Sequence, residues 1–261
     1  MKLGIILPPF SESFDRAKAL GLDAVEFTMN EGADLDAFES RLPEMKKKSE
    51  ETGVTVSSIG RWGAPRQRDD GVLIPSQAEA DRRLIDACAF LGCPVFVCNF
   101  NFAKEKTLFE NYALAIDYLS ALIAYGKEKG IKIATYNCEW EGFLVREADW
   151  KIVHGHLPRL GIKFDPANSA YNGADPMVEA AHWGDRFYHV HLKGHLIIEG
   201  KRVDDPPAGL DDTNWPALIA LLVAKGYDGT LSIEPHSEFW NGERGEKGID
   251  YTIRYFQNLL F

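Results

Sequence analysis

The chain has 261 residues, of which 45% are apolar and 26% are charged, and its formal net charge is −10. This length is large for one ordinary domain and leaves enough apolar side chains for a large core. The acidic balance argues against nucleic acid as a partner, because binding of its backbone relies on Lys and Arg to neutralise phosphates.

Cysteine usage and hydropathy predict where the protein works. The four cysteines form no C-x-x-C pair, and three of them lie in apolar surroundings typical of buried thiols in a reducing compartment. The apolar run near the N-terminus is too short for a secretory signal, and no run approaches the ~18 apolar residues of a membrane span. We expect a cytoplasmic protein without membrane contact, and its oligomeric state is open, a homo-oligomer included.

A repeated pattern predicts the helix-to-strand passages. Helical residues, a Gly and then a β-type run recur seven times, and Gly just past a helix end is the expected left-handed cap. These glycines are Gly21, Gly53, Gly92, Gly130, Gly161, Gly184 and Gly226.

The strands alternate with helical segments, which predicts βαβ units and a parallel sheet. The eight predicted strands are Leu3–Leu7, Ala24–Thr28, Val54–Ile59, Pro94–Phe100, Ile131–Tyr136, Gly161–Asp165, Phe187–Leu192 and Thr230–Glu234. The predicted helices are Ser13–Leu20, Leu35–Thr52, Ser76–Leu91, Thr107–Lys129, Trp215–Ala224 and Asp250–Leu260.

Eight such units favour a closed (β/α)8 TIM barrel, whose usual length of roughly 250 residues fits this chain. A dinucleotide-binding fold would need a Gly-rich turn after the first strand, and the chain has Pro8-Pro9-Phe10-Ser11 there. We therefore predict a single domain over residues 1–261, and we expect the loop Glu199–Thr213 to lie on the catalytic rim, where it could cover the pocket.

Three predicted strands in succession end at Asp165, His191 and Glu234. In a TIM barrel the catalytic groups lie at the carboxyl ends of the strands, so these side chains should meet. Oxygen and nitrogen ligands without a thiolate suit Mn²⁺, Mg²⁺, Co²⁺ or Zn²⁺. The alternative is that each is a hydrogen-bonded or ion-paired residue of the rim.

Four stretches carry a family resemblance: GIKFDPANS, FYHVHLKGH, GLDDTNW and GYDGTLSIEPHSE. With them, nearly the whole chain resembles the sugar phosphate isomerase/epimerase superfamily of xylose isomerase-like TIM barrels. That superfamily also holds ketose 3-epimerases, inosose dehydratases and AP endonucleases. The resemblance implies one divalent metal ion on Glu, Asp, His and Glu of the last four strands, and Asp165, His191 and Glu234 match three of these.

The fifth strand departs from the family pattern. Tyr136 stands where relatives have the ligand Glu, so we expect Glu139 to reach back as the fourth ligand, with Asn137 or an incomplete site as alternatives. Asn168 stands where relatives often have a His that binds substrate or a second metal, which argues against a multi-zinc endonuclease site.

The resemblance also implies substrate contacts. Lys193 follows His191 by two residues and faces the same side of the strand, with a rim salt bridge as the alternative. Asn168 occupies a substrate-binding position of the family. We add Trp62, whose ring could stack on a sugar, with packing as the favoured alternative for a single Trp. We also add His189, which lies one layer deeper and for which a core histidine or a partner behind the ligands is the favoured alternative.

We therefore expect a sugar isomerase or epimerase that works on a small sugar or polyol. Glu234, with Glu139 as its partner, would exchange a proton next to a metal-polarised carbonyl. The alternatives are a lyase that dehydrates a keto-polyol and a non-catalytic sugar-binding barrel.

Overall fold

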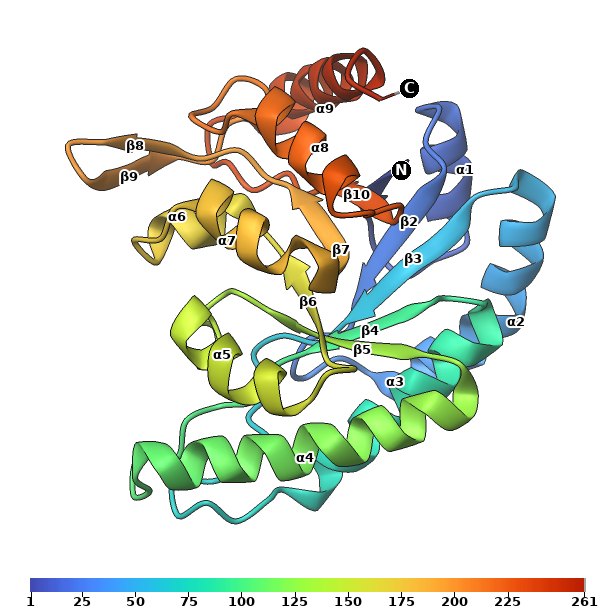
Figure 1. Ribbon diagram of the computed structural model, residues 1–261. Coiled ribbons are helices and arrows are strands. Elements are labelled where there is room, and N and C mark those ends of the chain that lie inside the picture. The colour runs from blue at the N-terminus through green and yellow to red at the C-terminus, as the bar shows by residue number, and fades with distance from the viewer. Residues whose placement is uncertain (261) are drawn as a thin grey trace.

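The computed structural model describes residues 1–260 and contains a closed barrel of eight parallel strands with helices around it (Figure 1). The predicted (β/α)8 TIM barrel is confirmed. The barrel strands are β1 Lys2–Ile6, β2 Ala24–Thr28, β3 Thr55–Gly60, β4 Val95–Cys98, β5 Lys132–Tyr136, β6 Gly161–Phe164, β7 Phe187–Leu192 and β10 Thr230–Ile233. Their order around the barrel is β1-β10-β7-β6-β5-β4-β3-β2, so the first strand closes against the last.

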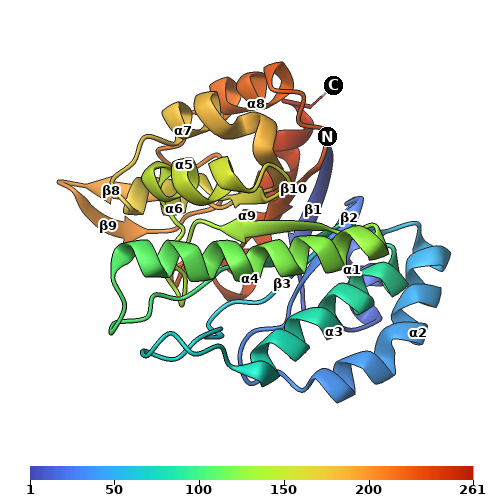
Figure 2. The same cartoon turned by 60° about the horizontal axis from the view of Figure 1, so that its bottom comes forward.

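Helices surround the barrel and cover its outer face (Figures 1 and 2). They are α1 Glu12–Ala19, α2 Leu35–Thr52, α3 Pro75–Leu91, α4 Leu108–Lys129, α5 Glu147–His156, α6 Pro166–Tyr171, α7 Pro176–Trp183, the 3₁₀ turn η1 Gly184–Arg186, α8 Trp215–Ala224 and α9 Gly242–Gln257. Among residues 1–260, no helix combines the length and the apolarity that crossing a membrane requires.

The period of two along each strand separates two environments. Val25, Ile162 and Val190 point outward into the large apolar core shared with the helices. Glu26 and Lys163, which alternate with the outward-facing residues of β2 and β6, are buried but lie outside that core. The barrel therefore contains charged side chains on strands whose other face is apolar.

The long segment after β7 contains structure that the sequence did not predict. Strands β8 (Leu196–Ile198) and β9 (Lys201–Asp204) form an antiparallel hairpin that projects from the barrel (Figure 1). Its turn uses left-handed backbone at Glu199 (φ 52°) and Gly200 (φ 75°). The predicted loop Glu199–Thr213 is thus partly a β-hairpin.

The last helix begins earlier than predicted, at Gly242 instead of Asp250. Its first turns have the sequence GERGEKG. Glycine has a low helix propensity, so the sequence does not indicate a helix there. Gly248 and Ile249 are both buried, so tertiary packing stabilises this segment.

Five of the seven predicted glycine caps are left-handed, with φ between 72° and 76° at Gly21, Gly53, Gly92, Gly130 and Gly226. The other two predictions are wrong. Gly184 has a right-handed φ of −58° and continues into the turn η1.

Gly161 lies inside β6 and serves a different purpose. A Cβ atom built on it would lie 2.0 Å from Cδ2 of Tyr188 on the neighbouring strand β7. Glycine is therefore required here by the close approach of the tyrosine ring.

We predict that Gly161→Ala lowers the free energy of unfolding by about 1–3 kcal/mol, because the added methyl group overpacks this contact. Chemical denaturation of the purified variant measures the change. The control is Gly155→Ala in the exposed part of α5, where a Cβ meets no atom within 4 Å. It should be neutral or stabilise by roughly 0.5–1 kcal/mol. Equal effects of the two substitutions would contradict the conclusion that the Tyr188 ring requires glycine at position 161.

Candidate functional site

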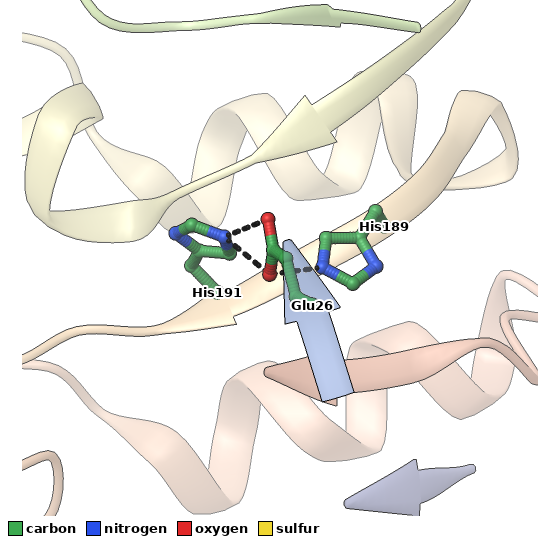
Figure 3. Close-up of side chains that lie close together, drawn as sticks. All are labelled: Glu26, His189 and His191. Carbon is green, nitrogen blue, oxygen red and sulfur yellow. Dashed lines mark hydrogen bonds and ion pairs between the residues drawn. The ribbon is translucent and has the colours of Figure 1, made fainter. Parts of the chain in front are cut away.

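Three buried side chains from two non-adjacent strands meet inside the barrel (Figure 3). Glu26 projects from β2 toward His189 and His191 on β7. Its Oε2 lies 2.8 Å from Nε2 of His189, and both of its oxygens lie 3.0 Å from Nε2 of His191. Glu26 thus fixes the orientation of both imidazole rings.

The other ring nitrogen of His191 faces two further carboxylates. Nδ1 lies 2.7 Å from Oε2 of Glu234 and 3.8 Å from Oδ2 of Asp165. Asp165 follows β6, His191 belongs to β7 and Glu234 follows β10, and these three strands are adjacent. One ligand atom of each residue lies within 4.8 Å of the ligand atoms of the other two. Asp165, His191 and Glu234 therefore meet, as the sequence predicts. A second group also has ligand atoms within 4.8 Å of one another, and it consists of Glu26, His189 and His191.

The charges of this cluster shift its titration. Burial alone would lower the pKa of His191, but the carboxylates of Glu26 and Glu234 outweigh it and raise the pKa to about 10. Burial alone would raise the pKa of Glu234, but Lys193 and His191 lower it to about 2. The pKa of Asp165 is likewise depressed, because Lys163 and Lys193 outweigh its burial. The pKa of Glu26 falls well below its usual value through His191 and His189.

Asp165 is held rigidly at the start of α6. Its Oδ1 accepts hydrogen bonds from the backbone N–H groups of Ala167 (3.0 Å) and Asn168 (3.3 Å), which cap the helix. The Asn168 side chain donates to Oδ2 at 2.9 Å. Asn137 accepts from the Asp165 N–H (3.1 Å) and donates to its carbonyl (2.9 Å). Asn168 and Asn137 thus position Asp165.

The fifth strand brings no carboxylate to this group. Glu139 is exposed, and its Oε1 pairs with Nη2 of Arg146 at 3.1 Å. The hydroxyl of Tyr136 donates to the carbonyl of Trp140 at 2.8 Å, and its ring stacks on Trp62 with centroids 5.2 Å apart. The amide oxygen of Asn137 is engaged by Asp165. The structure therefore does not place Glu139, the expected fourth ligand, with the other three.

A cavity of about 140 Å³ opens above the cluster at the carboxyl ends of the strands. Of the expected substrate-binding residues, Trp62, Asn168 and Lys193 line it. His189 does not, because it lies deeper in the barrel against Glu26. The full lining is Ile6, Thr28, Asn30, Trp62, Cys138, Trp140, Lys163, Asn168, His191, Lys193, Glu234 and His236.

Two residues of this site were not among those that the sequence singled out as site residues. Lys163 on β6 is 1% exposed, and its Nζ lies 3.5 Å from Oδ2 of Asp165. It precedes Asp165 by two positions, so strand parity alone places it on the same side. Glu26 is recognisable as a polar residue of the second predicted strand, but its partners are separated from it by more than 160 residues, so no local pattern pairs them.

Asp205 connects the segment after the hairpin to the rim of the cavity. It accepts a hydrogen bond from Tyr171 of α6 and pairs with Nε of Arg202 (3.0 Å) and with Nδ1 of His236 (2.9 Å). The pKa of Asp205 is lowered, since its partners outweigh its burial. These contacts hold the segment after β9 against the rim of the cavity. Nζ of Lys193 lies on the same side, 3.9 Å from Oδ2 of Asp205.

We predict that Glu26→Gln lowers the pKa of His191 from about 10 in the metal-free protein, because it removes one of the carboxylates that stabilise the imidazolium. Ring ¹⁵N shifts measured by NMR against pH report the change. In the native protein the raised pKa means that the charged His191 ring stabilises the folded state. This stabilisation is complete below the unfolded pKa of about 6.5 and is lost as pH rises through about 10. Glu31→Gln, on the exposed loop after β2, should leave the titration unchanged. An unaltered pKa in Glu26→Gln would show that Glu26 does not control this ring.

Comparisons with known proteins agree with this architecture. The uncharacterized protein YfiH of Bacillus subtilis (strain 168) is 22% identical over 91% of each chain. The fold matches the solved structures of mannonate dehydratase from Streptococcus suis serotype 2 (TM-score 0.78, 15% identity, 99% of this chain and 93% of that one) and of 3-keto-D-glucoside 4-epimerase from E. coli (TM-score 0.74, 18% identity, 99% of both). The model of one family, the xylose isomerase-like TIM barrels, matches residues 14–259, and the chain therefore belongs to that family.

Proposed function

We propose that the protein is a metal-dependent isomerase or epimerase of a sugar or sugar derivative. The observation that carries the proposal is the convergence of Asp165, His191 and Glu234 within 4.8 Å at the carboxyl end of the barrel. His191 and Glu234 also line the cavity, where a small polyol would meet them.

The donor set fits one divalent ion. Two carboxylates and one imidazole suit Mn²⁺, Mg²⁺, Co²⁺ or Zn²⁺, and a three-residue set leaves coordination positions for substrate oxygens. Binding would require His191 to release its Nδ1 proton, which Glu234 now accepts in a hydrogen bond. Glu139 could join only by leaving Arg146, so the proposed set has three residues.

A bound divalent ion would polarise a sugar carbonyl and so acidify the neighbouring C–H group. Glu234 is the proposed base, because its carboxylate is ionised at neutral pH and faces the cavity. Lys193, 3.8 Å from Oε1 of Glu234, would bind a substrate oxygen next to this base. Trp62 supplies an aromatic wall, and Asn168 holds Asp165 in place.

A specific observation favours a lyase as the second candidate. Epimerisation by two bases needs a second group that returns a proton on the face opposite Glu234, and the fifth strand offers Tyr136, whose hydroxyl is bonded to Trp140. Dehydration of a keto-polyol begins with the same proton abstraction and needs only one carboxylate base. Structural neighbours carry both kinds of name, a 4-epimerase and a dehydratase, which supports either reaction on this fold.

We predict that the purified protein binds about one Mn²⁺ per chain and that Asp165→Asn weakens this binding by roughly tenfold or more, since even the loss of a residue behind the ligands typically costs 10–100-fold. Calorimetric titration of the chelator-treated protein measures both values. Asp69→Asn, an exposed carboxylate outside the barrel, is the control and should bind as the native chain does. If no divalent ion binds, the enzyme hypothesis fails in favour of a non-catalytic sugar-binding barrel.

We predict that Glu234→Gln reduces exchange of solvent deuterium into a substrate ketose by roughly 10²–10⁴-fold, the usual contribution of a positioned base. Mass spectrometry of the recovered sugar follows the exchange, and the products separate an epimerase from a dehydratase. Glu243→Gln, exposed on α9, is the control. Circular dichroism verifies the fold and a parallel metal titration verifies loading. Undiminished exchange in Glu234→Gln would exclude this residue as the base.

A further inference from the structure

A second cavity, of about 290 Å³, lies at the amino ends of the barrel strands. Lys127 in the last turn of α4, Lys132 at the start of β5, Arg159 just before β6 and Tyr188 near the start of β7 all line it. The catalytic groups of a TIM barrel lie at the other end, where the strands finish. No residue lines both this lower cavity and the cavity of the candidate site, so a ligand bound here is distinct from the substrate.

The charged side chains that line the lower cavity are all cations, namely Lys127, Lys132 and Arg159. Within residues 1–260, none of the three has a carboxylate oxygen within 4.0 Å. Lys129 provides the contrast, because its Nζ pairs with Asp86 at 2.7 Å and it does not line the cavity. Three cations without an ion pair are therefore gathered in one hollow of a protein whose formal net charge is −10.

The sign of these charges selects the sign of the ligand. Glu128 follows Lys127 along α4, but its side chain is exposed and does not line the cavity. A concave site lined by one sign of charge concentrates ligands of the opposite sign. The guanidinium of Arg159 can in addition hold two oxygens of one phosphate or carboxylate group.

The ring of Tyr188 connects two of the cations. It lies so close to β6 that only glycine fits at position 161, where a Cβ atom would be 2.0 Å from Cδ2 of the tyrosine. Nζ of Lys132 lies 5.0 Å from the centroid of the ring, a cation–π contact that orients the ammonium without neutralising its charge. The tyrosine hydroxyl donates a hydrogen bond to the carbonyl of Arg159 at 3.3 Å. Tyr188 therefore holds Lys132 and the backbone of Arg159 on the same wall.

The rest of the lining is largely apolar and limits the ligand further. Ile131 and Ile133 are buried, and Ile123 is half-buried beside them. The volume is near the lower end of the roughly 300–1,000 Å³ of ordinary small-molecule sites. A matching ligand is therefore small and has an apolar body next to its anionic group.

We propose that the lower cavity binds a small phosphate monoester with an apolar body. Lys127, Lys132 and Arg159 contact its phosphate oxygens, and the isoleucine side chains contact its body. A phosphate monoester carries a charge of about −1.5 to −2 at pH 7, which suits three cations better than the single charge of one carboxylate does. The proposal does not depend on the proposed function, because it concerns other residues at the other end of the barrel.

Titrations followed by NMR test the proposal on the full, chelator-treated chain, with phenyl phosphate as the probe. The amide signals of Lys132 and Tyr188 report binding in the lower cavity, and those of Asn168 and Lys193 report binding in the candidate site. At the lower cavity, phenyl phosphate should bind roughly tenfold or more tightly than phenol, inorganic phosphate, benzoate or D-glucose 6-phosphate, because only phenyl phosphate combines the dianion with the apolar body. Added NaCl should weaken binding of phenyl phosphate.

Lys132→Met and Arg159→Met should each weaken binding of phenyl phosphate in the lower cavity by roughly tenfold. Arg159→Lys keeps the charge but not the planar fork, so it should retain part of the affinity. Lys129→Met is the matched control and should leave the affinity nearly unchanged, because this neighbouring lysine pairs with Asp86 instead of lining the cavity. The side chains of Lys132 and Arg159 are exposed, so the variants should fold, and thermal melting verifies this.

Phenyl phosphate that shifts only the amides of Asn168 and Lys193, or that binds the lower cavity no more tightly than phenol or inorganic phosphate, would overturn the proposal. Tighter binding of benzoate or of D-glucose 6-phosphate there, or undiminished binding in the folded Lys132→Met and Arg159→Met variants, would overturn it as well. The measurement needs neither metal nor turnover, so its result is separate from those of the metal and exchange experiments.

Discussion

The position of His191 between carboxylates of two other strands is the contact on which the site depends. Glu26 of β2 binds its Nε2 at 3.0 Å, and Glu234 at the end of β10 binds its Nδ1 at 2.7 Å. Because both nitrogens are engaged, the ring has one orientation, and Nδ1 faces the carboxylates of the rim. A metal ion entering this site would displace the Nδ1 proton, while Glu26 kept the ring in place.

Burial of so many charges is compatible with folding because opposite charges alternate along the cluster. Removing ions from water costs several kcal/mol each unless they are paired. Lys163 lies beside Asp165, which faces His191, and His191 in turn contacts Glu26. The apolar core between the barrel and the helices is separate from this cluster and supplies the packing. The stability of the barrel therefore comes from the apolar core more than from the polar interior.

Local patterns in the sequence predict the barrel well and the site in part. The bounds of Ala24–Thr28 and Phe187–Leu192 match β2 and β7, because alternation and flanking turns are local signals. Asp165, His191 and Glu234 follow from strand ends alone. The partnership of Glu26 with β7 depends on closure of the barrel, which no local pattern encodes. The direction of Glu139 depends on the path of the loop after β5, which Tyr136 fixes by bonding to Trp140.

Tyr136 on the fifth strand and the buried Lys163 on β6 are connected through the ring of Trp62. Tyr136 stacks on Trp62, and that same Trp62 ring lies 5.7 Å from Nζ of Lys163. A carboxylate in the position of Tyr136 would add a negative charge on this side of the cavity, opposite in sign to Lys163. With the neutral tyrosine, the charge of Lys163 is opposed mainly by Asp165, which also faces His191. Asp165 therefore faces both Lys163 and His191, which together with Lys193 hold its pKa well below the ordinary value.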